Sequence, residues 1–200
     1  GAMSIYQSIN SFCFMFPIGC SASASARIGL HLGKMDPRRA KLASFVSMAG
    51  AMALSTTMGA ILFFVPHDFF PWLFTPDPYV ISETSSTISF LAIYVFADGM
   101  QAALNGILKG CGKQAVAMPI VIVSYWCVGV PLAYYNAFIL NDGSSECQDS
   151  RFCGLAGLVA GMTMGTWMHF FLLLIAVVVT VNWRKEAIKA QDRVSTEKKI

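Results

Sequence analysis

One acidic residue stands in the middle of a stretch that is otherwise suited to lipid. Residues 91–114 read LAIYVFADGMQAALNGILKGCGKQ, and the acid is Asp98. Tyr94, Gln101 and Asn105 follow the three- and four-residue spacing that places side chains on one face of a helix with Asp98. A carboxylate among hydroxyl and amide groups can bind a cation and release it when a proton takes its place.

The composition indicates which solvent surrounds this carboxylate. Hydrophobic residues make up 56% of the 200 residues, charged residues 12%, and the mean hydropathy is +0.59. A soluble domain carries about 25% charged residues, so this chain has too few charges to cover a globule. A lipid bilayer is therefore the expected environment.

Five apolar runs are long enough to cross a bilayer as helices, because about 20 residues span roughly 30 Å of hydrocarbon. They lie near 5–26, 42–65, 88–108, 115–140 and 154–181. The first run is amphipathic, since it contains Gln7, Asn10 and Pro17. We predict an all-α polytopic membrane domain over residues 1–183, followed by a basic tail at 184–200.

The third run has Asp98 near its centre. Leu108 lies about 15 Å further along such a helix, so the carboxylate is predicted near the bilayer midplane. A charge there costs at least about 2.5 kcal/mol, and Asp98 must face protein or water. Two interpretations remain open: Asp98 joins helices through hydrogen bonds, or it loads and releases a cation or proton. We favour the second, because ionisable residues at this depth usually serve function.

Basic and acidic loops alternate along the chain. Lys and Arg gather at 27–41, 109–113 and 184–199, whereas 66–87 has three acids and no Lys or Arg. Basic residues are held on the cytoplasmic side of a membrane. We therefore predict a non-cytoplasmic N-terminus and a cytoplasmic tail, which can contact anionic membrane lipids.

Two cysteines, Cys147 and Cys153, lie in the loop at 141–153, on the predicted outer side. Outside the cytosol a disulfide between them is expected, and two unpaired thiols are the alternative. The loop has no His, which disfavours a zinc site. We expect no bound metal.

Five motifs occur in order along the chain. They read FPIGCSASASARIGLHLGKMDPRRAK, WLFTPDPYVI, ADGMQAALNGILKGCGKQ, YWCVGVPL and NWRKEAIKAQDR. Together they resemble the multidrug and toxic compound extrusion family of transporters, in its eukaryotic branch. The resemblance implies that the chain corresponds to the last five of twelve core helices, which form most of the C-terminal lobe of a two-lobe transporter.

The resemblance also implies roles for single positions. Asp98 falls on the cation- or proton-coupling carboxylate of the family's tenth helix. Lys109 stands where the family pattern has Arg. Lysine keeps the positive charge but cannot form the planar, two-pronged hydrogen bonds of a guanidinium. His169 stands where Gln is common. It either titrates near neutral pH or hydrogen-bonds a neighbour, and we favour the second.

If the third and fourth helices line a cavity, they bring one anion together with amide and aromatic groups. Beside Asp98, the candidates for this cavity are Tyr94, Gln101, Asn105, Tyr125, Trp126 and Tyr134. This set suits an organic cation, since each aromatic ring attracts one by about 0.5–2 kcal/mol. For Tyr125 and Trp126, ordinary packing is an equally good interpretation. Pro17 and Pro131 lie inside spans and predict either hinges or static kinks.

These observations predict a secondary active antiporter that exports organic cations, or xenobiotics, against H⁺ or Na⁺. H⁺ is the favoured coupling ion. A flippase for lipid or oligosaccharide and a non-transporting membrane assembly subunit are the alternatives.

We expect no enzyme activity, no cofactor and no nucleic-acid partner. The plasma membrane and a vacuolar or other endomembrane are both compatible. Five spans are too few for two repeats, so we expect an N-terminal lobe of the same protein as partner, and no transport by this chain alone.

Overall fold

The computed structural model describes residues 1–139 and 154–197, and all regular structure in these residues is helical. The helices are α1 (Ala2–Gly33), α2 (Pro37–Phe64), α3 (Phe69–Trp72), α4 (Pro78–Gly110), α5 (Gln114–Val121), η1 (Ile122–Gly129), α6 (Val130–Tyr134), η2 (Tyr135–Ile139), α7 (Gly154–Thr180) and α8 (Trp183–Glu197). The predicted all-α architecture is confirmed. Cys147 and Cys153, with their predicted disulfide, lie outside the described residues.

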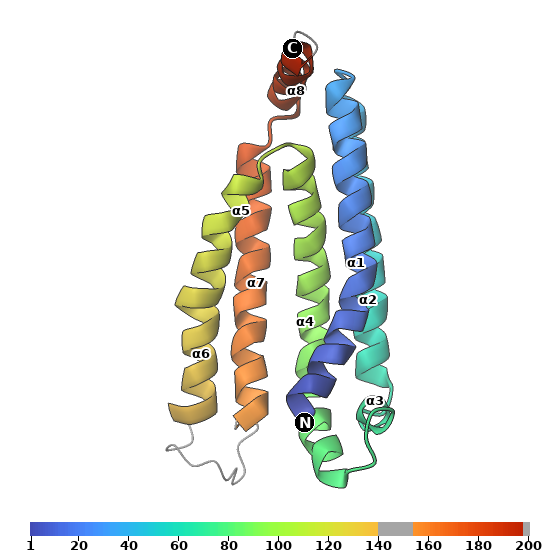
Figure 1. Cartoon of the computed structure of the whole chain (residues 1–200), viewed down its shortest axis with the longest axis vertical. Coiled ribbons are helices and arrows are strands. Elements are labelled where there is room, and N and C mark those ends of the chain that lie inside the picture. Colours follow the sequence, from blue (N-terminus) through green and yellow to red (C-terminus); the bar gives the residue numbers. More distant parts are fainter. Residues whose placement is uncertain (140–153, 198–200) are drawn as a thin grey trace.

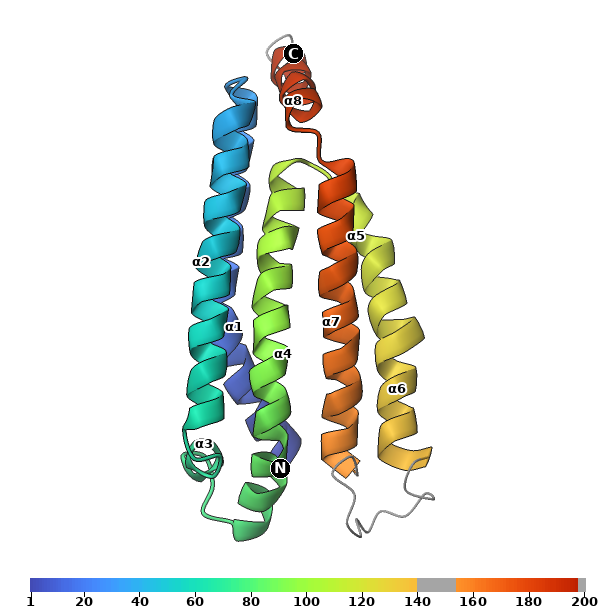
Figure 2. The same ribbon diagram turned by 180° about the vertical axis from the view of Figure 1, so that it is seen from behind.

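Helix α4 is the centre of the bundle (Figure 1, Figure 2). It packs against α1 and α2 on one side and against α7 on the other. The continuous segment from α5 to η2 covers the far side of α7 (Figure 1). A side chain in the middle of α4 can therefore be enclosed by helices from both halves of the chain.

Four helical segments are long and apolar enough to cross a membrane. They are Pro37–Phe64, Pro78–Gly110, Gln114–Ile139 and Gly154–Thr180, and they coincide with four of the five predicted spans. The remaining predicted span is α1, which has 32 residues and is therefore about 48 Å long. It runs beside α4 in both views (Figure 1, Figure 2). Its apolar stretch is interrupted by the polar residues Gln7 and Asn10.

Two helices begin at an Asp-Pro pair. The Asp36 carboxylate accepts a hydrogen bond from the Arg39 backbone N–H at 3.1 Å, and Asp77 accepts one from the Tyr79 backbone N–H at 3.0 Å. Asp is a favoured N-cap, and proline at the first helical position has no N–H to leave unsatisfied. The loops before α2 and α4 thus fix where both helices start.

Glycine allows α7 to approach its neighbours closely. A Cβ at Gly165 would lie 2.9 Å from the Gly129 Cα and 3.1 Å from the Ser124 carbonyl oxygen. A Cβ at Gly161 would collide with the Ala133 backbone. Small residues at four-residue spacing permit this backbone contact in membranes. It brings η1, the part of the fourth span that carries Tyr125, directly against α7.

Both predicted hinge prolines lie where helix geometry changes. Pro17 is buried inside α1, and the N-terminal part of α1 inclines toward α4 (Figure 1). Pro131 is exposed and stands in the first turn of α6, directly after the π-helical segment η1. Proline lacks the N–H of the helical hydrogen bond, and π-helical turns are rare and frequent at functional sites. Whether either proline acts as a hinge stays a prediction.

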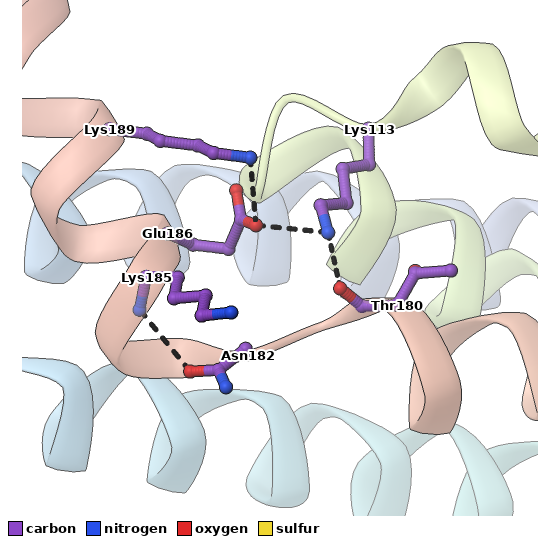
Figure 3. Close-up of polar contacts among 6 residues, drawn as sticks. All are labelled: Lys113, Thr180, Asn182, Lys185, Glu186 and Lys189. Carbon is purple, nitrogen blue, oxygen red and sulfur yellow. Dashed lines mark hydrogen bonds and ion pairs between the residues drawn. The ribbon is translucent and has the colours of Figure 1, made fainter.

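The basic tail folds as α8 and docks on the bundle. The Glu186 carboxylate is 3% exposed and lies 2.9 Å from the Lys113 ammonium and 3.7 Å from that of Lys189 (Figure 3). Lys113 also donates a hydrogen bond to the Thr180 carbonyl oxygen at the end of α7 (Figure 3). Ala187 joins the apolar core. The segment that the sequence predicted only as a basic tail is thus, through residue 197, a helix anchored at the α4–α5 connection.

Candidate functional site

Asp98 lies in the central helix, inside the bundle. It is 6% exposed and follows the start of α4 at Pro78 by about 30 Å along the axis. The helices α1, α2 and α7 pack around α4, which places protein between this carboxylate and any surrounding lipid. The side chains that face Asp98 inside the bundle therefore set its chemistry.

A row of hydrogen-bonding groups leads from Asp98 across to α7. The Gln101 side-chain amide donates to the Asp98 Oδ1. Gln101 Nε2 also lies 3.4 Å from the Tyr125 hydroxyl, and that hydroxyl lies 3.2 Å from the Thr166 Oγ1. We call Asp98, Gln101, Tyr125 and Thr166 the polar lane. It connects α4, η1 and α7 through the interior of the bundle.

Two tyrosines add to the surroundings of Asp98. Tyr94 lies about one turn before it on α4 and is half-buried, while Tyr6 on α1 is buried. Both are close enough for their hydroxyl groups to interact electrostatically with Asp98. Tyr94 is thus where its spacing predicted. Tyr6 could not be found from the sequence, because its proximity depends on how α1 packs against α4.

Asp98 has no fixed counter-ion in the described part of the chain. The ion pairs there join Asp36 with Arg39, and Glu186 with Lys113 and Lys189. The side chain that hydrogen-bonds Asp98 is the neutral amide of Gln101. Nor do three or more His, Cys, Asp or Glu side chains within these residues gather as metal ligands. The described residues thus give Asp98 a hydrogen-bond donor and no positive charge.

The structure brings only some of the predicted candidates to Asp98. Gln101 and Tyr125 belong to the polar lane, and Asn105 is half-buried further along the same helix. Trp126 is 72% exposed and Tyr134 is 58% exposed, so both lie on the outer surface of the fourth span. Successive helical residues point in different directions, and Trp126 therefore cannot share the direction of Tyr125.

The sequence analysis named His169 of α7 but missed Thr163 and Thr166, and the hydrogen bond that it favoured for His169 is not found among the described residues. Thr163, Thr166 and His169 are spaced by three residues, and all three are buried. This is the spacing that identified the polar face of α4, so the same rule applied to 154–181 would have found them. The contacts of Thr166 and His169 with Tyr125, however, depend on the close packing of α7 on η1.

The sequence of the chain matches a known family of proteins. The family model MatE matches residues 1–135, which is more than half of the chain. The chain belongs to the MatE family. The resemblance to multidrug and toxic compound extrusion transporters predicted from the five motifs is confirmed, as is an integral, multi-pass membrane protein.

Relatives of this MatE chain occur in Arabidopsis thaliana. Protein DETOXIFICATION 36 is 31% identical over 96% of this chain and 36% of its own length. Protein DETOXIFICATION 14 is 30% identical over 96% of this chain and 37% of its own length. The crystal structure of the eukaryotic MATE transporter AtDTX14 superposes with a TM-score of 0.86 at 30% identity, over 96% of this chain and 40% of that one. The chain spans a little over a third of these curated relatives.

Proposed function

We propose that this chain is the cation-binding lobe of a secondary transporter that exports organic cations in exchange for protons. The observation that carries the proposal is the buried carboxylate of Asp98, which has a neutral amide as its partner and no counter-ion among the described residues. A buried charge without a fixed partner is costly. A mobile cation or a proton can relieve that cost.

Competition for one carboxylate explains exchange. A bound organic cation neutralises Asp98, and the rings of Tyr6, Tyr94 and Tyr125 can attract it further. A proton that binds Asp98 removes the negative charge, so the cation loses its main attraction and leaves. Deprotonation toward the opposite side of the membrane restores the site. A proton is favoured over Na⁺ because it needs one oxygen, whereas Na⁺ needs several oxygen ligands around it.

The relatives' length supports a second lobe. Each is more than twice as long as the part that this chain covers, and transporters with two repeats bind substrate where the repeats meet. We infer that the N-terminal lobe of the same protein completes the site, and that the basic end of the bundle with α8 faces the cytoplasm. The substrate is a small organic cation, because a carboxylate beside aromatic rings favours a positively charged guest with apolar surface.

The test uses the full-length transporter in proteoliposomes with an imposed pH gradient and ethidium as a fluorescent organic cation. Asp98→Asn is expected to reduce proton-driven flux roughly 10- to 100-fold, because an interaction with a charged group contributes about 1.5–3 kcal/mol. Glu83→Gln is the matched control. Glu83 is an acid on the same helix α4, but it lies near the N-terminal end of the helix rather than in its middle. Full transport by Asp98→Asn would refute the role of Asp98. Proton-coupled flux by residues 1–200 alone would refute the requirement for an N-terminal lobe.

A further inference from the structure

His169 of α7 is a buried titratable group that the proposed exchange does not yet use. Its side chain is 4% exposed, and neither Nδ1 nor Nε2 has a hydrogen-bond partner among the described residues. Buried polar side chains in native proteins nearly always have a partner, and those without one mark a functional group or a bound solvent molecule. His169 therefore offers two unused nitrogen atoms inside the bundle.

The imidazole lies at the α7 end of the polar lane. Thr166 is three residues earlier on α7, which places it on the same helix face, and its hydroxyl is hydrogen-bonded to Tyr125. The Tyr125 and His169 rings meet edge to face, with centroids 5.4 Å apart and planes at 71°. His169 and Asp98 thus flank the same tyrosine, one through ring contact and the other through Gln101.

On the helices packed against α7, the described residues place no Lys, Arg or Glu near the middle of the bundle, where Asp98 is the one acid. On α4 the titratable groups near this depth are Tyr94 and Asp98, while Lys109 lies at one end of the helix and Tyr79 and Glu83 at the other. The titratable groups of η1 are Tyr125 and the exposed Cys127, and those of α6 and η2 are the exposed Tyr134 and Tyr135. Helix α5 has no titratable side chain. A proton on His169 would therefore add a positive charge at the end of the polar lane, which His169 and Asp98 share through Tyr125 and Gln101.

We propose that His169 is a second proton-binding group of the Asp98 site, so that two protons are exchanged for each organic cation. The inference rests on the proposed function and refines it. A proton on Asp98 cancels the attraction for the cation, and a proton on a ring nitrogen of His169 repels the cation from the polar lane. The His169 ring is in contact with the Tyr125 ring, with centroids 5.4 Å apart, so a charge on the imidazole lies next to the polar lane.

Both protons enter from the side to which the cation is released and leave from the other side. No covalent bond is made or broken beyond the N–H and O–H bonds of these protons. The resemblance implies that Gln is common at this position in the family. Gln can hydrogen-bond but cannot take up a proton, so a second proton would depend on the histidine at this position.

The test is the proton-to-ethidium ratio of the full-length transporter, obtained from the ethidium gradient at which flux reverses under a fixed pH gradient. His169→Gln and His169→Asn keep a hydrogen-bonding amide near Nε2 and Nδ1, respectively. Each is expected to lower the ratio from about two to about one and to halve the steepness with which flux rises with proton concentration. His31→Gln is the matched control, because His31 is a half-buried histidine at the end of α1, and it should keep the wild-type ratio.

A wild-type measurement covers the case in which neither variant folds. Ethidium binding to the purified transporter in weakly buffered solution should release about two protons, and release of one would overturn the inference. An unchanged ratio in a folded His169→Gln variant would overturn it as well. Asp98→Asn separates the two proposals: if it is inactive while His169→Gln behaves as wild type, only the role of His169 fails, and if it transports normally the proposed function fails.

Discussion

The bundle contains two buried carboxylates with opposite surroundings. Asp98 in the middle of α4 is 6% exposed and has the Gln101 amide as its partner. Glu186 on α8 is 3% exposed and lies between the ammonium groups of Lys113 and Lys189 (Figure 3). Burial is nearly the same for both. What differs is whether the chain supplies the positive charge.

This difference separates a structural acid from a binding acid. The lysines at Glu186 come from the chain itself and stay in place, so the ion pairs fix α8 to the α4–α5 connection. Asp98 lies about 18 Å from the end of α4, away from the basic loops. In the proposed function its positive partner is a mobile cation from outside the described residues, which can arrive and also leave.

A lysine placed beside Asp98 should give this carboxylate a permanent ion pair like that of Glu186. Gln101→Lys would place an ammonium where the amide now donates to Asp98, and the carboxylate would then resemble Glu186. We expect ethidium flux by the full-length transporter to fall roughly 100-fold, while the protein remains folded, because the internal ion pair excludes the mobile cation. Gln101→Asn keeps a neutral amide and should retain most of the flux. Normal flux in Gln101→Lys would show that Asp98 does not bind the transported cation.

The two regions are also held together by different forces. The polar lane depends on the close contact of α7 with the fourth span, so Gly161→Val should push α7 away from Ala133 and separate Thr166 from Tyr125. Overpacking costs about 3 kcal/mol at such a site, and we expect lower thermal stability together with weaker ethidium binding. Met164→Val, at a residue of α7 that is 50% exposed, should change neither. Thermal unfolding and binding titrations measure both effects, and unaltered binding in Gly161→Val would contradict the dependence on packing.

Removing the charge of Glu186 should destabilise the protein without changing its ion coupling. Glu186→Gln leaves Lys113 and Lys189 without their anion, and hydrogen bonds to charged groups contribute about 1.5–3 kcal/mol. The expected result is a lower unfolding temperature with an unchanged proton-to-ethidium ratio. Lys185→Gln serves as the comparison, since its side chain is exposed on the same helix. A changed ratio in Glu186→Gln would mean that the two acids do not have separate roles.

The smallest effect is expected inside the polar lane. Tyr125→Phe keeps the ring against His169 and removes the hydroxyl that joins Gln101 to Thr166. A neutral hydrogen bond contributes about 0.5–1.5 kcal/mol, so ethidium affinity should fall about two- to tenfold. Trp126→Phe, on the exposed surface beside it, should leave affinity unchanged. Equal losses in both variants would place the binding site on the outer surface of the span.

Local pattern was enough to predict four of the five spans and the position of Gln101 beside Asp98 on α4. Span length and the alternation of charged loops are properties of short stretches, and the spacing around Asp98 needs only one helix. The π-helical segment η1 was not predicted, and it sets the direction in which Tyr125 and Trp126 point. The docking of α8 was missed for another reason, because Lys113 and Glu186 meet only after α7 has packed. Residues this far apart in the sequence cannot be paired from local pattern, and the proximity of Tyr6 to Asp98 was missed for the same reason.

The anchoring of α8 has a consequence for biosynthesis. Ribosomes make a chain from its N-terminus, and Glu186 leaves the ribosome after every membrane helix described for this chain has been made. Until then, the ammonium of Lys113 has no acid to hold it against the end of α7. Helix α8 therefore adds its ion pairs to a bundle whose membrane helices have already been made, and a chain that stops short of residue 186 should reach the membrane without this anchor.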